Sequence, residues 1–298
     1  MVEHGYSKPF SAALTAAAGT IGVIIPPSVP FVIYGVVSGA SITSLFTAGF
    51  LPGILMGVAL MIVCFIVSKK RGYRGSTEPP NASVIWATFK DAIWAILSPV
   101  IILGGIYSGK FTPTEAAVIS VVYSYIVGRF VYKELDGSST YKALKDAIVI
   151  NGATTFMVGL STAFAALLTM EQIPMKIAGF ITSISQNGFV ILLLINLLLL
   201  LVGMFIDNIP ATIILTPILL PICRKFGMSP ITFGIMLTMN LAIGFCTPPY
   251  GINLFVATAI SKVKMEALSK ELILLIGALI VVLGAVTYIP SVTTIFLK

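Results

Sequence analysis

The segment Gly22-Val-Ile-Ile-Pro26-Pro27 interrupts one apolar run of this chain, and Gly244-Phe-Cys-Thr-Pro248-Pro249 interrupts another 222 positions later. Three further pairs share this offset: Gly5 and Gly227, Ser7 and Ser229, and Ile21 and Ile243. Because proline lacks a backbone donor and clashes with the preceding turn, a helix should stop at each Pro-Pro pair. In a bilayer, freed backbone groups are tolerated only beside protein or a water-filled cavity. The repeated break therefore predicts duplicated halves and a transport site near the membrane midplane.

The composition places the chain in a membrane. Apolar residues make up 57% of it and charged residues only 10%, whereas soluble domains carry roughly 25% charged residues. The length suggests ~8 to 10 crossings of ~20 residues each. The net charge of +7 does not indicate nucleic-acid binding, because the basic residues lie in short loops and fit the positive-inside pattern instead.

We divide the chain into three parts, of which residues 1–75 form the end of a first repeat. The broken apolar segment is followed by a scaffold helix from Leu45 to Val67, which ends in the densest basic cluster, Lys69 to Arg74. We place this end in the cytoplasm. Gly75 to Asn81 reads as a loop.

Residues 76–187 are expected to link the two repeats through interfacial and scaffold helices. Ser83 to Ala95 reads as an amphipathic helix at the interface, with Trp86 and Trp94 as anchors. The crossings expected after it are Ala95 to Tyr107, Ala116 to Val131 and Ile148 to Leu168. The basic residues between them, Arg129, Lys133, Lys142 and Lys145, mark a second cytoplasmic loop.

A helix should begin within Ser108 to Glu115. Thr112 can cap it, Pro113 suits its first position, and Glu115 suits the positive end of its dipole. A capping role for Glu115 is favoured over a substrate contact.

Residues 188–298 form the second repeat. Apolar arms from Val190 to Ile206 and from Ala211 to Ile222 flank Asp207-Asn208-Ile209-Pro210. Each arm is short for a crossing, so we expect a re-entrant helical hairpin. Its Leu-rich run, Leu192 to Leu201, is interpreted as packing without a chemical role. The broken helix from Ile231 to Ile260 and a final scaffold helix from Leu272 to Tyr288 should follow.

This path makes the repeats inverted. The helix before Pro26 enters from the cytoplasm, and the helix before Pro248 enters from outside. Inverted repeats permit alternating access by movement of one unit against another. The first repeat has no hairpin ahead of Gly5, so we expect the chain to be incomplete relative to its own symmetry, or a separate chain to supply the missing half.

Asp207 is the sharpest candidate for chemistry, because an acidic group at membrane depth usually pairs with an ion, a proton or a partner. The alternative is an N-cap for the following helix, with no ion. The carbonyls of Gly22 to Ile25 and of Gly244 to Thr247 should lose their helical donors and become cation ligands. The hydroxyls of Ser28 and Thr247 could also bind the cation. The alternative interpretation is that both breaks are simple helix kinks without a bound ion.

Helix starts after the breaks, near Ser28 and Tyr250, offer N–H groups for a substrate carboxylate. Asn253 could hydrogen-bond the substrate or the ion. The sequence contains none of the common hydrolase, nucleotide-binding or dinucleotide-binding motifs, so an enzyme is not expected. The three cysteines lack metal-site spacing, and the lone histidine, His4, reads as solvated.

Several long motifs resemble the large membrane subunit of the tripartite ATP-independent periplasmic (TRAP) transporters. They are Ala12 to Gly22 with Pro26-Pro27-Ser28-Val-Pro30, Phe111 to Ala117, Gly203 to Asp207, and Asn240 to Gly244 with Thr247 to Asn253. The resemblance implies an all-α integral membrane protein of the bacterial inner membrane, an inverted-repeat, elevator-type transporter similar in fold to divalent-anion/sodium symporters. It also implies that the chain lacks the family's N-terminal stretch with the first hairpin.

The resemblance further implies import of a small organic acid (a C4-dicarboxylate, a keto acid or sialic acid) with sodium as the coupling ion and no other cofactor. The implied partners are a small four-helix membrane subunit, a periplasmic substrate-binding protein and the lipid bilayer. Sodium candidates are Gly22, Asp207, Asn208, Gly244 and Thr247. Substrate candidates are Pro26, Ser28, Pro248 and Asn253.

Two other interpretations stay open. The chain could be a truncated or split, non-autonomous part of a transporter. It could also be a single-component sodium/anion symporter that needs no binding protein.

Overall fold

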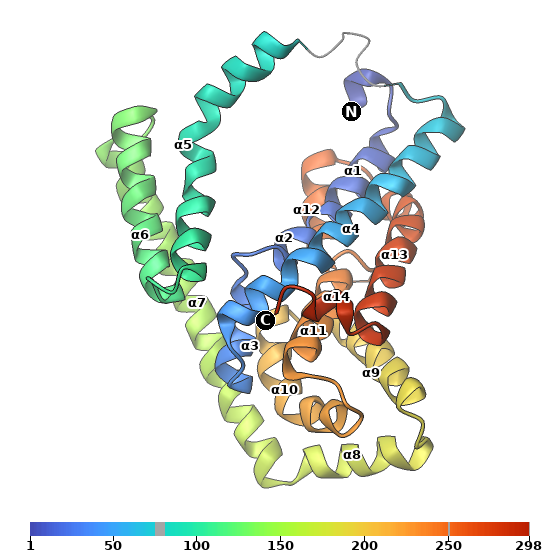
Figure 1. Ribbon diagram of the computed structural model, residues 1–298. Coiled ribbons are helices and arrows are strands. Elements are labelled where there is room, and N and C mark those ends of the chain that lie inside the picture. Colours follow the sequence, from blue (N-terminus) through green and yellow to red (C-terminus); the bar gives the residue numbers. More distant parts are fainter. Residues whose placement is uncertain (75–80, 250, 298) are drawn as a thin grey trace. The chain divides into compact units, whose positions relative to one another are not determined.

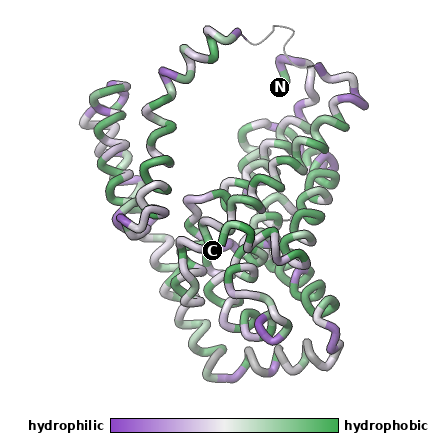
Figure 2. Tube along the Cα trace, viewed as in Figure 1, coloured by the Kyte–Doolittle hydropathy of each residue, from purple (hydrophilic) through white to green (hydrophobic). Residues whose placement is uncertain are grey.

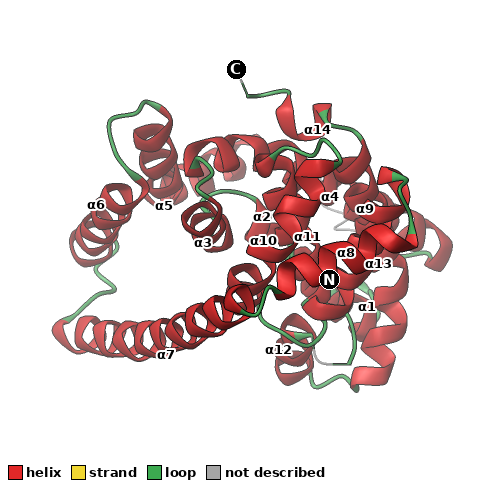
Figure 3. Cartoon of the chain, turned by 90° about the horizontal axis from the view of Figure 1, so that it is seen from below, coloured by secondary structure: helices red, strands yellow, loops and turns green. Residues whose placement is uncertain are grey.

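The computed structural model describes residues 1–74, 81–249 and 251–297, and in these ranges all regular secondary structure is helical (Figure 3). The longer elements are α1 (Lys8–Ala18), α3 (Val29–Ser38), α4 (Ile42–Arg71), α5 (Ala82–Tyr107), α6 (Pro113–Ile126), α7 (Gly137–Met170), α8 (Ile173–Ile184), α9 (Gly188–Gly203), α10 (Asn208–Lys225), α11 (Pro230–Gly244), α12 (Ile252–Ser261) and α13 (Met265–Tyr288). The short elements are η1 (Val2–His4), α2 (Ile21–Ile24), η2 (Val127–Val131, a π-helix) and α14 (Ser291–Thr294).

The chain divides into two compact units. Unit 1 contains Met1–Gly75 and Leu160–Lys298, and unit 2 contains Ser76–Gly159. Helix α7 begins in unit 2 and ends in unit 1. The first and third parts expected from the sequence therefore fall together in unit 1.

The 222-residue repeat is visible in the elements of unit 1. Helix α1 begins at Lys8 and α11 at Pro230, and each is capped by a serine, Ser7 or Ser229, whose hydroxyl accepts an N–H three residues on. Helices α3 and α4 correspond in the same way to α12 and α13. Both Pro-Pro pairs interrupt the helices as expected, and both of their peptide bonds are cis.

The two copies of the broken helix run in opposite directions. The Tyr34 hydroxyl of α3 donates to the Pro230 carbonyl at the start of α11, at 2.6 Å. The Asn253 amide of α12 donates to the Ala16 carbonyl of α1, at 3.1 Å. The start of one copy thus lies beside the end of the other, and Figure 1 shows α1 to α3 descending while α12 lies above α11.

Helices α9 and α10 form a helical pair joined by the turn Met204–Asp207. Both pack against α11, and α10 also packs against α3 and α8. Helix α8 was not expected as a separate element, since its residues were assigned to the link between the repeats. A re-entrant path of α9 and α10 through a bilayer stays a prediction.

Unit 2 differs from the sequence expectation in two places. Ser83 to Ala95 is not a separate interfacial helix, because α5 continues through it to Tyr107. Lys142 and Lys145 lie on α7 and not in a loop. The predicted start of α6 is confirmed: Thr112 and Glu115 form a reciprocal capping box, with 2.7 Å from the Thr112 N–H to the carboxylate.

Within the described ranges, five helices are long and apolar enough to cross a membrane, or six if the bent segment Lys8–Ile24 with Val29–Ser38 counts as one span. The number is below the eight to ten crossings expected, because α9, α11 and α12 are only 10 to 16 residues long. Figure 2 shows apolar helices with polar residues gathered at connections. The chain is an integral membrane protein.

Candidate functional site

The loop at the second Pro-Pro break is held by short-range hydrogen bonds to backbone carbonyls. Thr247 donates its N–H to Gly244 O at 3.0 Å and its hydroxyl to Ile243 O at 2.8 Å. The Asn253 N–H donates to Phe245 O at 2.9 Å, which closes the loop from α11 to α12. A Cβ built on Gly251 would lie only 2.7 Å from Phe245 O and 3.0 Å from Thr247 O, so these two carbonyls converge beside Gly251.

The first break is organised by Ser28. Its hydroxyl donates to Val23 O at 2.6 Å and accepts the Phe31 N–H at 3.3 Å, so it ties the end of α2 to the start of α3. Ser28 and Pro26 are buried, whereas Gly22 and Pro27 are exposed. A hydroxyl can donate once and accept twice, so one acceptor position of Ser28 is left for a ligand.

Three of the break carbonyls accept other hydrogen bonds in place of the helical ones that the Pro-Pro pairs remove. Val23 O accepts the Ser28 hydroxyl, Gly244 O accepts the Thr247 N–H, and Phe245 O accepts the Asn253 N–H. The loops fold back on themselves, because buried backbone groups without a partner are costly. A carbonyl oxygen still has a second lone pair that can face a cation.

Asp207 is half-buried and caps α10, with its carboxylate accepting the Asn208 N–H at 2.7 Å. The capping role proposed for it is therefore present. Capping by one oxygen leaves the second carboxylate oxygen free to serve an ion, so the two roles are compatible.

Asn208 lies at the first position of α10 and is almost completely buried. Its side-chain oxygen accepts the Thr212 hydroxyl at 3.1 Å, while its amide nitrogen Nδ2 has no hydrogen-bond partner. An unpartnered buried donor is unfavourable by about 1–3 kcal/mol. Its position at the positive end of a helix dipole suits an anionic group.

The backbone of α9 lies in close contact with the backbone of α11 just before the second break. A Cβ built on Gly244 would collide with the backbone of Gly203, the last residue of α9. This contact places the turn that carries Asp207 next to the end of α11. Glycine at both positions removes the side chains that would otherwise hold the two helices apart.

Asn253 follows the second break, and its side chain faces α1. Its amide donates to Ala16 O and it lines a cavity of about 440 Å³ between α1 and α12. Neither Pro-Pro pair lines this cavity. Tyr250, the expected start of a substrate-binding helix, lies outside the described residues.

A buried polar network joins α9, α11 and α13 and was not expected from the sequence. Asn240 of α11 donates to the side-chain oxygen of Asn196 at 2.8 Å, and Asn196 donates to the Thr287 hydroxyl at 3.2 Å. All three side chains are buried. Asn196 belongs to the run that was interpreted as packing alone; an asparagine in an apolar membrane segment was the signal for a specific partner.

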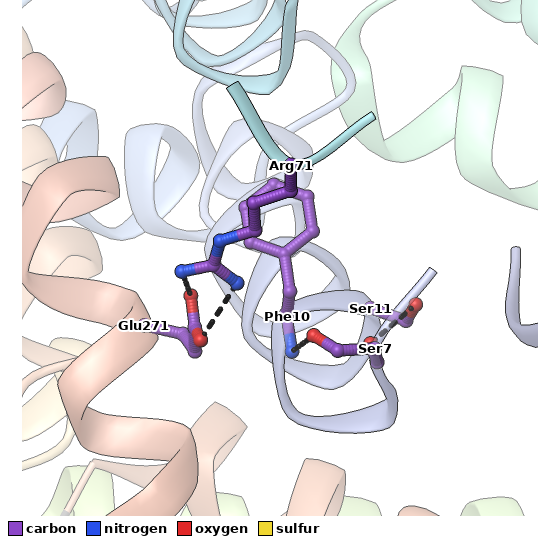
Figure 4. Close-up of polar contacts among 5 residues, drawn as sticks. All are labelled: Ser7, Phe10, Ser11, Arg71 and Glu271. Carbon is purple, nitrogen blue, oxygen red and sulfur yellow. Dashed lines mark hydrogen bonds and ion pairs between the residues drawn. The ribbon is translucent and has the colours of Figure 1, made fainter. Parts of the chain in front are cut away.

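An ion pair joins α4 to α13 at the end of unit 1 that lies away from the two breaks. Arg71 at the end of α4 makes a bidentate contact with Glu271 of α13, with both distances 2.9 Å, and its guanidinium stacks 5.7 Å from the Phe10 ring of α1 (Figure 4). Both copies of the repeat thus contribute to one clasp, well separated along the helices from the breaks.

Known proteins are similar to this chain over nearly its whole length. The family model described as "Tripartite ATP-independent periplasmic transporter, DctM component" matches residues 1–292. The chain is 46% identical over 296 residues to the isethionate TRAP transporter permease protein DctMQ of Oleidesulfovibrio alaskensis, covering 99% of this chain and 47% of that protein.

Two further relatives have other named substrates. The sialic acid TRAP transporter permease protein SiaT of Haemophilus influenzae is 37% identical, over 99% of this chain and 48% of its own length. The C4-dicarboxylate TRAP transporter large permease protein DctM of Pseudomonas aeruginosa is 39% identical, over 98% of this chain and 68% of its own length. The chain thus spans about half the length of the first two relatives.

Proposed function

The chain belongs to the DctM family of tripartite ATP-independent periplasmic transporters, and we propose that it forms the substrate-translocating part of a permease that imports a small organic anion with sodium. The observation that carries this proposal is the pair of helix breaks at equivalent positions of two oppositely running repeats. Such breaks place backbone dipoles inside a membrane protein, where they serve ions and charged substrates.

The proposed substrate class is anionic, and the relatives support no narrower choice. Their names specify a sulfonate, a carboxylated sugar and dicarboxylates, which share negative charge and small size. The sulfonate extends the range beyond the carboxylic acids expected from the sequence. The buried, unpartnered Nδ2 of Asn208 at the start of α10 is the donor that we assign to the anion.

We assign sodium to oxygens on either side of the contact between Gly203 and Gly244. The Asp207 carboxylate supplies the charge, and the Thr247 hydroxyl and the carbonyls that converge beside Gly251 supply neutral oxygens. Hard cations prefer such oxygen ligands. Gly22, Pro26, Ser28 and Pro248 keep their proposed roles at the breaks, as backbone and hydroxyl contributors.

The proposed setting is the bacterial inner membrane, with a small four-helix membrane subunit and a periplasmic binding protein as partners. In this arrangement unit 1 carries the site, and its broken helices and the α9–α10 pair move in the elevator manner against scaffold helices. The chain's share of the relatives' length favours a part that acts together with further polypeptide over an autonomous transporter.

Asp207→Asn tests the sodium site separately from the helix cap. Asparagine caps helices about as well as aspartate, so the thermal unfolding midpoint in detergent should hold, while sodium-dependent uptake of substrate into proteoliposomes of the complete permease should fall at least about tenfold, which corresponds to about 1.4 kcal/mol. Asp146→Asn, on exposed α7, is the matched control. Unchanged uptake with unchanged sodium dependence in Asp207→Asn would contradict the assignment of sodium to this site.

The partner assignment needs its own experiment. Uptake of isethionate, sialic acid and succinate is measured with and without the cognate periplasmic binding protein. Uptake that requires the protein supports the tripartite system, and equal uptake without it favours the single-component symporter.

A further inference from the structure

The hydrogen bond between Asn196 and Asn240 is a feature of unit 1 that the proposed transport site does not use. It joins α9 to α11 at 2.8 Å, between two buried side chains. Each amide also donates to the carbonyl four residues earlier in its own helix, Asn196 to Leu192 O and Asn240 to Met236 O, both at 2.8 Å. Both side chains are therefore fixed to their own helices as well as to each other.

The same two helices meet again where the sodium site is proposed. Gly203 follows Asn196 on α9 by about two helical turns, and Gly244 follows Asn240 on α11 by about one turn. A Cβ on Gly244 would collide with the Gly203 backbone, and a Cβ on Gly203 would lie 2.9 Å from Leu241 Cα. The amide bond and the glycine contact are thus two fixed points between α9 and α11.

Two fixed points define the register of α9 on α11, which is the position of one helix along the other. The turn after α9 carries Asp207, while Thr247 and the carbonyls beside Gly251 follow α11. A slip of α9 by one residue would shift Asp207 by about 1.5 Å. Binding groups must be held within about 0.5 Å of their productive positions, so the proposed sodium ligands come together in only one register.

The residues around Asn196 cannot set this register by themselves. They are the leucines and isoleucines of α9, and apolar side chains pack against a neighbouring helix with little preference for one exact position. A buried asparagine pair is directional, and a single asparagine between two helices is known to specify their register at a cost in stability.

The pair is also a poor source of stability. The second amide atom of Asn240, its oxygen Oδ1, is buried and has no hydrogen-bond partner in the described part of the chain. An unpartnered buried acceptor is unfavourable, and an apolar pair of similar size is often equally stable or more stable in such a place. Register is therefore the contribution that suits these two amides best.

The first repeat has no such amide. The 222-residue offset places Ala18 at the position of Asn240 and Phe65 at the position of Thr287, the third member of the network. Phe65 is 69% exposed. The amide bond is therefore confined to the break that α9 covers, where the register of α9 matters.

We propose that Asn196 and Asn240 are positioning residues for sodium. Their hydrogen bond sets the register of α9 on α11 and so holds the Asp207 turn at the second break. Neither amide touches the ion. This inference rests on the sodium site of the proposed function.

Sodium binding to the complete permease in detergent tests the proposal without a known substrate. A ligand that binds the folded state raises the thermal unfolding midpoint, so the measured quantity is the sodium chloride concentration needed for a fixed rise, with choline chloride keeping the ionic strength constant. Asn240→Ala should raise this concentration about tenfold. Thr287→Val is the matched control, because it disturbs the same network but keeps the bond between α9 and α11. It should stay within about twofold of the parent protein.

The double variant Asn196→Leu with Asn240→Leu separates positioning from stability. Replacing both partners by apolar groups leaves neither amide unpaired, so the midpoint without sodium should return toward that of the parent protein. The sodium requirement should stay about tenfold higher, because leucines do not fix the register. A sodium requirement that recovers together with the midpoint would overturn the proposal. If this variant does not fold, equal sodium requirements of Asn240→Ala and Thr287→Val overturn it.

Asp207→Asn, measured beside these variants, distinguishes the two possible failures. If it keeps the parent's response to sodium, the proposed sodium site fails and the positioning role fails with it. If Asp207→Asn loses the response while Asn240→Ala keeps it, only the positioning role is overturned.

Discussion

The two Pro-Pro breaks have the same local design but different surroundings. The second break lies under α9, with Gly244 against the backbone of Gly203, whereas Gly22 at the first break is open. Helix α11 is buried from Thr232 to Gly244, whereas α1 and the residue after it expose Thr15, Ala18 and Gly19 over the equivalent stretch. The difference shows that the helix break is a property of the segment, while its burial is a property of the helical pair that covers it.

The largest effect is expected where this contrast is sharpest. Gly244→Ala should destabilise the protein by about 1–3 kcal/mol or more, because its methyl group meets rigid backbone that cannot move aside. Gly22→Ala should change stability by no more than about 0.5 kcal/mol, because the site is open. Thermal unfolding of the purified protein in detergent measures both, and equal shifts would contradict the contrast.

The buried amide network should give the next largest effect. Asn240→Ala removes the donor to Asn196 and leaves buried polar atoms unpartnered, at an expected loss of about 1–3 kcal/mol. The equivalent residue in the first repeat is Ala18, which is exposed. Ala18→Asn should therefore stay within about 0.5 kcal/mol of the parent protein. A larger loss for Ala18→Asn in the same unfolding assay would mean that α1 is covered in the purified protein.

The serine caps should differ by a smaller amount. Ser229→Ala should cost about 1 kcal/mol, because Ser229 caps α11 at 3.0 Å and also contacts the buried Thr232 hydroxyl at 2.9 Å. Ser7→Ala should cost about 0.5 kcal/mol, at the low end for caps, since its bond is 3.4 Å. Ser229→Thr retains the capping oxygen and serves as control for chemical denaturation. A larger loss of stability for Ser7→Ala than for Ser229→Ala would contradict this expected difference.

The smallest effect is expected at the clasp between the two repeats. Glu271→Gln should lower stability by about 0.2–1 kcal/mol, because Arg71 and Glu271 are partly exposed and the pair is screened. The difference from the parent protein should shrink near 1 M salt, where the screening length is about 3 Å. A loss that persists at high salt would show that the contact with Phe10, and not the ion pair, holds the clasp.

Sequence reasoning predicted the local features of this fold well. The breaks at Pro26-Pro27 and Pro248-Pro249 and the capping box of Thr112 with Glu115 involve groups within a few residues of one another. Proline geometry and capping depend on such short range alone. The 222-residue offset then related the two halves without any structure.

The missed features are contacts over long sequence distances. The bond between Asn196 and Asn240 joins α9 to α11, and the bond from Asn253 to Ala16 joins the two repeats. The donors that replace the helical ones at the break carbonyls were also missed, because the sequence did not reveal how each loop folds back. Helix α8 escaped notice because its short segment lacks the length of a crossing.

The amino-acid sequence by itself determined that this protein lives in a membrane, that its helices break twice, and that its halves are related, because hydropathy and proline chemistry act locally. Only the tertiary structure decided which break is covered, which carbonyls are occupied, and where an open groove lies. Those outcomes depend on the close packing of helices far apart in the chain, and no residue carries that information alone.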